Sequence, residues 1–205
     1  MAKKETTKFY LGNQNLPVPN TAHDWTPEMV EDLELCKKNI LHFAENHFYI
    51  VSIDEGRQKI KLHKFQKRLL RSMRDNRFVV CTASRQIGKT TVLTIFALWL
   101  TCFSMDQSVL ILANKESTAI EILTRIRFAY ELLPNYLKPG VKTWGKSAVE
   151  FENGSKIEAS TTSTDSGRGK SISCIAGSEL ITIRNKTTGE VKQIPIQDLL
   201  LSEYK

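Results

Sequence analysis

The segment between residues 77 and 100 constrains the fold most, because a short glycine-containing loop there joins an apolar strand to an apolar helix. Residues 77–83 (RFVVCTA) form a β-branched and aromatic run that is typical of a strand. Residues 91–100 (TVLTIFALWL) are apolar and long enough for a buried helix. The succession of strand, loop and helix predicts an α/β fold with the loop at a helix N-terminus.

The loop residues are the types that bind phosphate. Free N–H groups and the positive end of the helix dipole favour an anion at a helix N-terminus. Gly88 lets the backbone approach, Lys89 can reach the β and γ phosphates, and the Thr90 hydroxyl can ligate Mg²⁺. The strict motif is not met, because Ala83 stands where the usual pattern has its first glycine. An ordinary helix start is the alternative interpretation of Gly-Lys-Thr.

A basic amphipathic helix is expected over residues 61–70, directly before the strand. Gln66 can both donate and accept hydrogen bonds, which suits the edge of an adenine ring, and Phe65 could stack nearby. A solvated glutamine on a basic helix is the alternative. From Arg57 to Lys89 there are eleven Lys/Arg and one Asp, an excess that could meet nucleotide or DNA phosphates or could be a solvated face.

Phe65-Gln66 followed by residues 84–90 (SRQIGKT) resembles the ATPase domain of the terminase large subunit of T-even-type tailed bacteriophages. The resemblance runs from about residue 24 to residue 173. Further segments follow in the family's order: 110–115, 130–134, 150–155 and 166–169. It implies an incomplete P-loop NTPase domain of the ASCE or RecA-like type with a parallel sheet, which uses ATP and Mg²⁺.

The same resemblance implies a motor that packages double-stranded DNA with a portal and a small terminase, in the cytoplasm of an infected bacterial host. A C-terminal nuclease accompanies the motor in that family. Arg85 matches a loop arginine that assists hydrolysis, beside Lys89, and Gln66 matches an adenine-contacting glutamine. The implied nucleotide-binding residues are Phe65, Gln66, Ser84, Arg85, Gln86, Ile87, Gly88, Lys89, Thr90 and Thr91, with Thr90 on magnesium.

Other elements follow from periodicity and turn signals. A helix is expected over 26–46, a strand over 48–54, a strand over 108–113 and a helix over 117–133 that ends before Pro134. Strands at 148–152 and 155–159 should flank an Asn153-Gly154 turn, and 161–170 should be a mobile loop. These elements suggest a subdomain over 1–55 and an ATPase core over 56–173.

Apart from the Mg²⁺ that the resemblance implies, metal sites, disulfides and membrane spans are not expected. The four cysteines show no paired spacing. His42 and His47 are expected on different faces of their helix, which makes a metal site there improbable. The apolar run over 90–103 is too short to span a bilayer, and the N-terminus does not resemble a signal peptide.

The sequence changes character at Cys174. A P-loop ATPase needs a second apolar strand ending in Asp-Glu, for magnesium and the attacking water. The family places that strand directly after Ser173, but residues 174–183 read CIAGSELITI. This segment resembles the opening block of an intein, which implies a short β-rich Hint fragment over 174–205. Cys174 would be its nucleophile, acting on the Ser173–Cys174 bond.

With about 32 intein residues after Ser173, the chain is expected to be a precursor fragment that a partner joins by trans-splicing. The partner would carry the C-terminal intein and the rest of the terminase. A family-specific insertion with an incidental cysteine, and a truncated gene, are the alternatives. A stand-alone nucleotide- or DNA-binding remnant is a different functional class. An accessory helicase fragment would share the loop but would not predict a cysteine at this junction.

Overall fold

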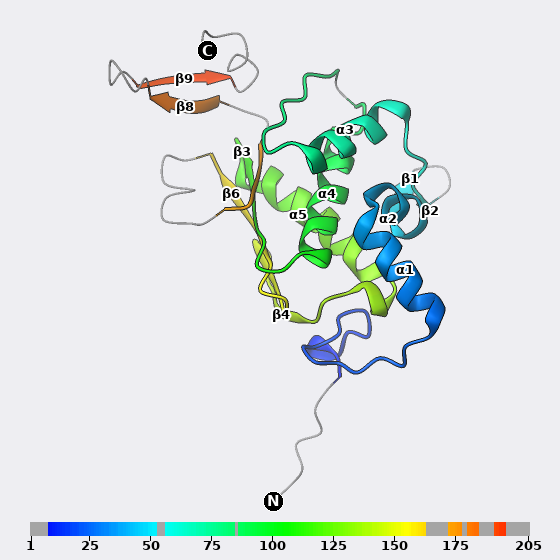
Figure 1. Cartoon of the computed structure of the whole chain (residues 1–205). Helices are drawn as coiled ribbons and strands as arrows, with labels where there is room; N and C mark the ends of the chain where they lie inside the picture. The colour runs from blue at the N-terminus through cyan, green and yellow to red at the C-terminus, as the bar shows by residue number, and fades with distance from the viewer. Residues whose placement is uncertain are drawn as a thin grey trace, which may run out of the picture.

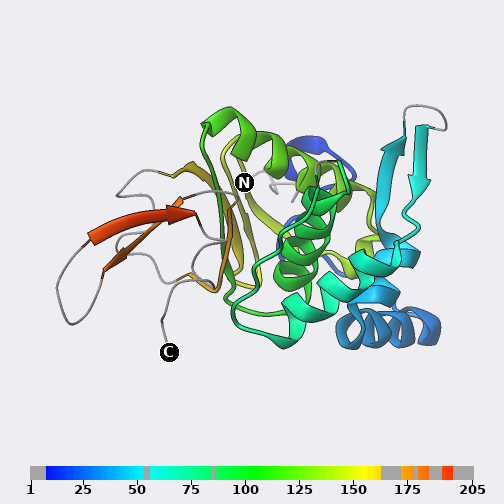
Figure 2. The same cartoon turned by 90° about the horizontal axis from the view of Figure 1, so that it is seen from above.

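The computed structural model describes residues 8–52, 56–84, 86–162, 172–177, 180–184 and 191–195. Helices lie on one side of a central sheet, and a separate two-stranded sheet near the C-terminus lies apart from them (Figures 1 and 2). The sheet is mixed, with one parallel part and one antiparallel part. The α/β class is confirmed, whereas a wholly parallel sheet is wrong for the described strands.

Two helices replace the single helix expected over 26–46. After a 3-10 turn at Tyr10–Gly12, helix α1 spans Pro27–Lys38 and helix α2 spans Ile40–His47. Asn39 separates them with an extended backbone, and its side-chain oxygen accepts hydrogen bonds from the N–H groups of Leu41 and His42. An N-terminal cap of this kind starts a new helix, so the chain changes direction here.

A hairpin and a basic helix lead toward the loop. Strand β1 (Tyr49–Ser52) pairs antiparallel with β2 (Gly56–Lys59), and helix α3 spans Lys64–Asp75. The strand expected at 48–54 and the helix expected at 61–70 are therefore present with shifted ends. On α3, Gln66 and Leu70 are buried while the basic side chain of Arg68 is exposed, as an amphipathic helix requires.

The central sheet has the strand order β4-β5-β6-β3-β7. Its members are β3 (Ser108–Ala113), β4 (Val141–Trp144), β5 (Ala148–Phe151), β6 (Lys156–Thr161) and β7 (Cys174–Gly177). Strand β3 runs parallel to β6 and to β7, while β4, β5 and β6 form antiparallel pairs. The predicted strand at 108–113 and the predicted hairpin are confirmed, and β4 is an addition.

Helices α4 (Lys89–Phe103) and α5 (Glu116–Leu132) pack on β3 and β6. Helix α5 ends two residues before Pro134, whose neighbour cannot readily continue a helix. A 3-10 turn at Asn135–Leu137 follows. One hydrophobic cluster joins α2, α4, α5 and the sheet; its largest fully buried members include Phe43, Ile95, Leu123, Tyr130, Phe151 and Ile157.

The turn between β5 and β6 is fastened to the end of α4. Gly154 has φ +78°, a left-handed conformation that suits glycine. The side-chain amide of Asn153 donates to the carbonyl oxygens of Thr101 (2.8 Å) and Ser104 (3.1 Å). The hydroxyl of Ser155 also donates to the Ser104 oxygen, at 2.9 Å. These bonds hold the helix that begins at the loop in place against the sheet.

The strand expected over 77–83 is wrong for this structure, because these residues join no sheet. Phe78 is 84% exposed and Cys81 is also exposed. Local β-propensity produces a strand only when a partner supplies the ladder hydrogen bonds, and no described strand lies alongside this segment.

Residues beyond Ser173 contribute strands in two places. Strand β7 lies at the edge of the central sheet, whereas β8 (Leu180–Arg184) and β9 (Val191–Pro195) form an antiparallel pair of their own. Figure 1 shows that pair at the end of the central sheet, away from α1 and α2. Most of the predicted loop at 161–170 lies outside the described residues, and the division into segments 1–55, 56–173 and 174–205 stays a prediction.

No helix within the described ranges combines the length and the apolar character needed to cross a bilayer. The apolar run over 90–103 lies in α4, where Val92, Ile95 and Leu98 are fully buried against the rest of the protein. The apolar side chains of this run therefore pack in the hydrophobic core.

Candidate nucleotide-binding loop and the strand after Ser173

The loop ends in a backbone turn that only certain residues adopt readily. Gln86 and Gly88 have φ values of +62° and +85°. Gly88 is the N-terminal cap residue of α4, so the first free N–H groups of the helix follow it directly. The loop therefore presents its backbone donors at the positive end of a buried helix, the arrangement that favours a phosphate group.

Lys89 folds back across the loop. Its ammonium group donates to the carbonyl oxygens of Ala83 (2.6 Å) and Ser84 (3.0 Å). These two bonds tie the first residue of α4 to the beginning of the loop. An ammonium held by carbonyl oxygens at the surface can exchange them for phosphate oxygens, because both partners accept hydrogen bonds from the same group.

Gln66 supports the loop from α3. Its side chain is only 5% exposed, and its oxygen accepts a hydrogen bond from the N–H of His63 at 2.9 Å. Its amide nitrogen faces Gly88 so closely that a β-carbon on Gly88 would lie 2.5 Å away. The structure therefore brings Gln66 to the phosphate-binding loop, while its contact with adenine stays a prediction.

The remaining predicted residues differ in how accessible they are. Ser84 and Gln86 are exposed, whereas Phe65, Ile87, Thr90 and Thr91 are half-buried. The backbone oxygen of Thr90 accepts a hydrogen bond from the Thr94 hydroxyl, a bond within α4. Arg85 lies outside the described residues, so its predicted role in hydrolysis stays a prediction.

Ser173 fixes the position at which β7 begins. Its N–H donates to the oxygen of Ser108 at 2.9 Å, and its hydroxyl accepts from the N–H of Ser108 at 3.2 Å. Cys174 then pairs with Val109, and the register continues to Gly177 opposite Leu112. The strand that follows Ser173 is thus set beside β3 by backbone contacts.

The acidic pair that a P-loop ATPase needs does not occur in the described part of the sheet. Strand β7 has the sequence Cys-Ile-Ala-Gly, and no described strand ends in Asp-Glu. The described residues therefore contain the loop predicted to bind phosphate, without the carboxylates that position magnesium and water in a P-loop ATPase.

Sequence reasoning missed a second group of reactive side chains. His42 and His47 were expected on different helix faces, but both imidazoles reach the carboxylate of Asp32, at 2.9 and 2.8 Å. The expectation was wrong because it considered one helix alone. Asp32 lies on α1, and the break at Asn39 turns that helix toward the two histidines.

A family model described as "Terminase large subunit, T4likevirus-type, N-terminal" matches residues 80–194. The match contains the loop, α4, α5 and all five strands of the central sheet. It begins later than the resemblance drawn from residue 24, and it continues beyond Ser173 through most of the segment expected to be an intein. The family match gives no support to an intein. Because the match spans more than half of the 205 residues, the chain belongs to the T4-like phage family of terminase large subunits, which are DNA-packaging ATPases, and contains part of the N-terminal region of that family.

Proposed function

We propose that the loop over residues 84–91 binds the phosphate groups of ATP together with Mg²⁺. The observation that carries this proposal is the Lys89 side chain, whose ammonium is held by two loop carbonyl oxygens directly at the start of α4. On nucleotide binding, Lys89 exchanges these carbonyls for the β and γ phosphate oxygens. The backbone N–H groups after Gly88 then face the same phosphates.

Magnesium requires an oxygen ligand close to those phosphates. The hydroxyl of Thr90, the second residue of α4, would supply it, and water molecules and phosphate oxygens would complete the coordination sphere. Arg85 acts on the same phosphates during hydrolysis in this proposal. Gln66 supports the loop at Gly88 and contacts the adenine edge after a rotation of its amide group.

Binding and hydrolysis are separable in the described region. Phosphate binding needs the loop and the helix start, whereas hydrolysis also needs a carboxylate that orients water. We therefore expect this chain to bind Mg²⁺-ATP with very low turnover. The complete motor would act on double-stranded DNA with a portal and a small terminase as its partners.

Lys89→Ala tests the nucleotide site. We expect the affinity for Mg²⁺-ATP to fall about 10- to 100-fold, because a charged hydrogen bond contributes about 1.5–3 kcal/mol. Titration calorimetry with the intact chain and a slowly hydrolysed ATP analogue would measure it. Lys142→Ala, at an exposed position on β4, is the matched control. Equal affinities of wild type and Lys89→Ala would refute the proposed site.

We further propose that Cys174 begins an intein, and that the chain is joined to the remainder of the terminase by protein trans-splicing. Two observations favour it. The strand beside β3 is Cys-Ile-Ala-Gly, without the carboxylates of the motor, and among the described strands β8 and β9 pair only with each other. The resemblance of residues 174–183 to an intein opening block agrees with both.

The chemistry starts at the Ser173–Cys174 bond. The Cys174 sulfur attacks the Ser173 carbonyl carbon, the carbon–nitrogen bond breaks, and the thiol proton ends on the released amine. The product is a thioester at Ser173. A nucleophile on the partner then accepts the acyl group, and cyclisation of the intein's terminal asparagine releases the intein.

The sheet supports such an exchange. Ser173 is bound to Ser108 through its own N–H and hydroxyl, so its position does not depend on which residue follows it. Strand β7 is held beside β3 by backbone pairing, which accepts other sequences. After splicing, the strand joined to Ser173 would start at the same register, opposite Val109, and could bring the missing Asp-Glu to the sheet.

Intact-mass analysis after co-expression with the downstream reading frame tests the joining. We expect a ligated product that lacks residues 174–205 and a released fragment that contains them. Two chains of unchanged mass would contradict trans-splicing and favour a nucleotide- or DNA-binding remnant. ATP-dependent activity of the unjoined chain, lost in Lys89→Ala, would support that alternative.

A further inference from the structure

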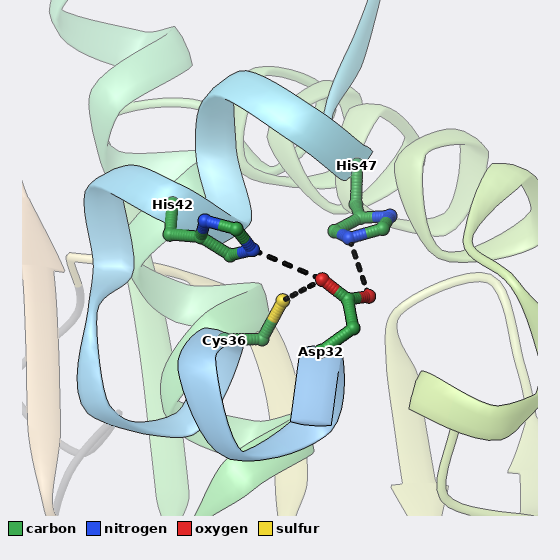
Figure 3. Close-up of side chains that lie close together, drawn as sticks. All are labelled: Asp32, Cys36, His42 and His47. Atoms are coloured by element: carbon green, nitrogen blue, oxygen red, sulfur yellow. Dashed lines mark hydrogen bonds and ion pairs between the residues drawn. The ribbon is translucent and has the colours of Figure 1, made fainter. Parts of the chain in front are cut away.

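Four metal-binding types of side chain meet between the first two helices. We name this group the α1–α2 cluster; its members are Asp32, Cys36, His42 and His47. One ligand atom from each member lies within 4.8 Å of the others. Figure 3 shows both imidazoles and the thiol directed at the Asp32 carboxylate. The cluster lies in α1 and α2, outside the loop over residues 84–91.

The helices dictate this convergence. Asp32 and Cys36 are four residues apart on α1, so their side chains occupy the same face. Asn39 ends that helix and caps α2, which carries both histidines. His47 is the last residue of α2. The Asp32 carboxylate sits between the three other members: one oxygen is 2.9 Å from Nε2 of His42 and 3.9 Å from the sulfur, and the other is 2.8 Å from Nε2 of His47.

One nitrogen of the α1–α2 cluster lacks a well-directed hydrogen bond. Nε2 of His47 is buried, and although it lies close to Asp32, no hydrogen bond with acceptable geometry to any described residue engages it. Its ion pair with the Asp32 carboxylate, at 2.8 Å, offsets part of the cost of burying this nitrogen. Coordination to a metal ion would use the lone pair of the nitrogen and give it a directed partner.

We propose that the α1–α2 cluster binds one Zn²⁺ ion and thereby clamps α1 to α2. Sulfur, two imidazole nitrogens and a carboxylate oxygen are ligands that Zn²⁺ takes in tetrahedral sites. Mg²⁺ and Ca²⁺ prefer oxygen ligands, so the same donor set disfavours them. The proposal is independent of the nucleotide site and of splicing.

Charge and geometry agree with Zn²⁺. A thiolate and a carboxylate carry two negative charges, which neutralise the ion and avoid a net buried charge. Tetrahedral Zn²⁺ places its ligand atoms about 3.3–3.6 Å apart, as follows from bond lengths of about 2.0–2.3 Å. The present separations, up to 4.8 Å, need a contraction of about 1 Å, which a rotation of the central Asp32 carboxylate would permit.

The surroundings shift the pKa values of two members of the cluster in opposite directions. Burial, assisted by the Asp32 carboxylate, raises the pKa of the Cys36 thiol to about 12. Burial opposes ionisation of Asp32 as well, but hydrogen bonds from the surrounding side chains outweigh it and lower the pKa of this carboxyl. A coordinating thiol loses its proton to solvent, so Zn²⁺ binding should release about one proton per chain.

Neighbouring side chains orient the members of the cluster through hydrogen bonds, as outer partners orient the ligands of metal sites. The Tyr136 hydroxyl donates to Oδ2 of Asp32 at 2.7 Å, and the Asn46 amide contacts Nδ1 of His42 at 3.2 Å. The same Asn46 nitrogen donates to the backbone oxygen of His42 at 3.0 Å, so the amide holds the ring with Nε2 directed at Asp32. Tyr136 thus positions Asp32 without binding the ion.

The α1–α2 cluster is reachable from solvent. A cavity of ≈ 680 Å³ borders Asp32, His42 and His47 and extends toward Tyr49 and Lys59. The side chains of His42 and Asp32 are 28% and 24% exposed. Glu28 also lines the cavity. A hydrated ion can therefore enter without opening the hydrophobic core.

Titration of the chelator-treated, reduced full chain with Zn²⁺ and with Co²⁺ tests the site. We expect one ion per chain, a thiolate-to-cobalt charge-transfer band, proton release in calorimetry, and a higher thermal midpoint with Zn²⁺. His42→Ala should weaken binding about 100-fold or more, because removing a ligand should exceed the 10- to 100-fold loss known for second-shell changes. Cys36→Ala should abolish the charge-transfer band.

Matched controls use cysteine and histidine residues elsewhere. Cys81→Ala changes an exposed cysteine and His23→Ala a half-buried histidine outside the cluster, and both should leave stoichiometry and spectrum unchanged. Tyr136→Phe should weaken binding about 10-fold and keep the charge-transfer band, as a positioning residue requires. Because His42 is partly exposed, His42→Ala keeps the test decisive if Cys36→Ala fails to fold. No stoichiometric binding, or equal binding by His42→Ala, would overturn the zinc site and leave a hydrogen-bonded cluster only.

Discussion

Cys174→Ala is expected to abolish the ligated product completely when the chain is co-expressed with the downstream reading frame. Without the sulfur no thioester can form at Ser173, so the acyl group is never transferred. The loss should be complete because thioester formation is the first covalent step, and alanine has no sulfur to attack the Ser173 carbonyl carbon. Intact-mass analysis should show both chains at their unchanged masses.

Cys81→Ala is the matched control, since Cys81 is an exposed cysteine in the part of the chain before Ser173. It should join as efficiently as the wild type. A ligated product from Cys174→Ala would contradict the assignment of the nucleophile. If neither wild type nor control joins, residues 174–194 are better understood as part of the terminase sequence itself, as the extent of the family match allows.

The fold was predictable where local signals and packing agree. The strand over 108–113 is a largely apolar run between polar flanking residues and lies between β6 and β7, so its ends match the prediction. Pro134 ends α5 because the residue before a proline avoids the helical region. Asn153-Gly154 specifies a turn, which the structure places between β5 and β6.

The fold was not predictable where a structure depends on contacts with a segment that is distant in the sequence. The apolar residues 77–83 have strand propensity, but pairing depends on a neighbour that local sequence does not reveal, and the described sheet supplies none. Asn39 was read as an interior residue of one long helix, although asparagine favours the N-terminal cap. Recognising that cap would have brought Asp32 near the two histidines.

The position of the loop at a helix start was predictable, but the contacts that the loop makes with α3 were not. The Gly88-Lys89-Thr90 sequence predicted a helix start, and α4 begins at Lys89. The burial of Gln66 against Gly88 was not expected, because the sequence suggested a side chain free to reach adenine. Contacts between α3 and the loop depend on how the two helices pack, which spacing along the chain does not determine.

Gly88→Val is the second large expected effect. Its φ of +85° lies in the left-handed region, which costs a non-glycine residue about 1–2 kcal/mol. A β-carbon there would also lie 2.5 Å from the Gln66 amide nitrogen. Moving Gln66 away would break its hydrogen bond with His63, worth about 1 kcal/mol. We expect the free energy of unfolding to fall by about 2–4 kcal/mol.

ATP binding should become undetectable in Gly88→Val, because the displaced turn no longer directs the first N–H groups of α4 at a phosphate. Gly12→Val separates backbone strain from the steric conflict. Gly12 has φ +77° with open space around its β-carbon position, so strain alone acts there and ATP binding should persist.

In the double variant Gly88→Val/Gln66→Ala the steric conflict is gone. Its loss of stability, measured by urea unfolding, should therefore be smaller than the sum of the two single losses, by about 0.5–3 kcal/mol for residues in contact. Additive losses would show that the contact between Gln66 and the loop contributes nothing, and the strained backbone of Gly88 would then account for the whole effect.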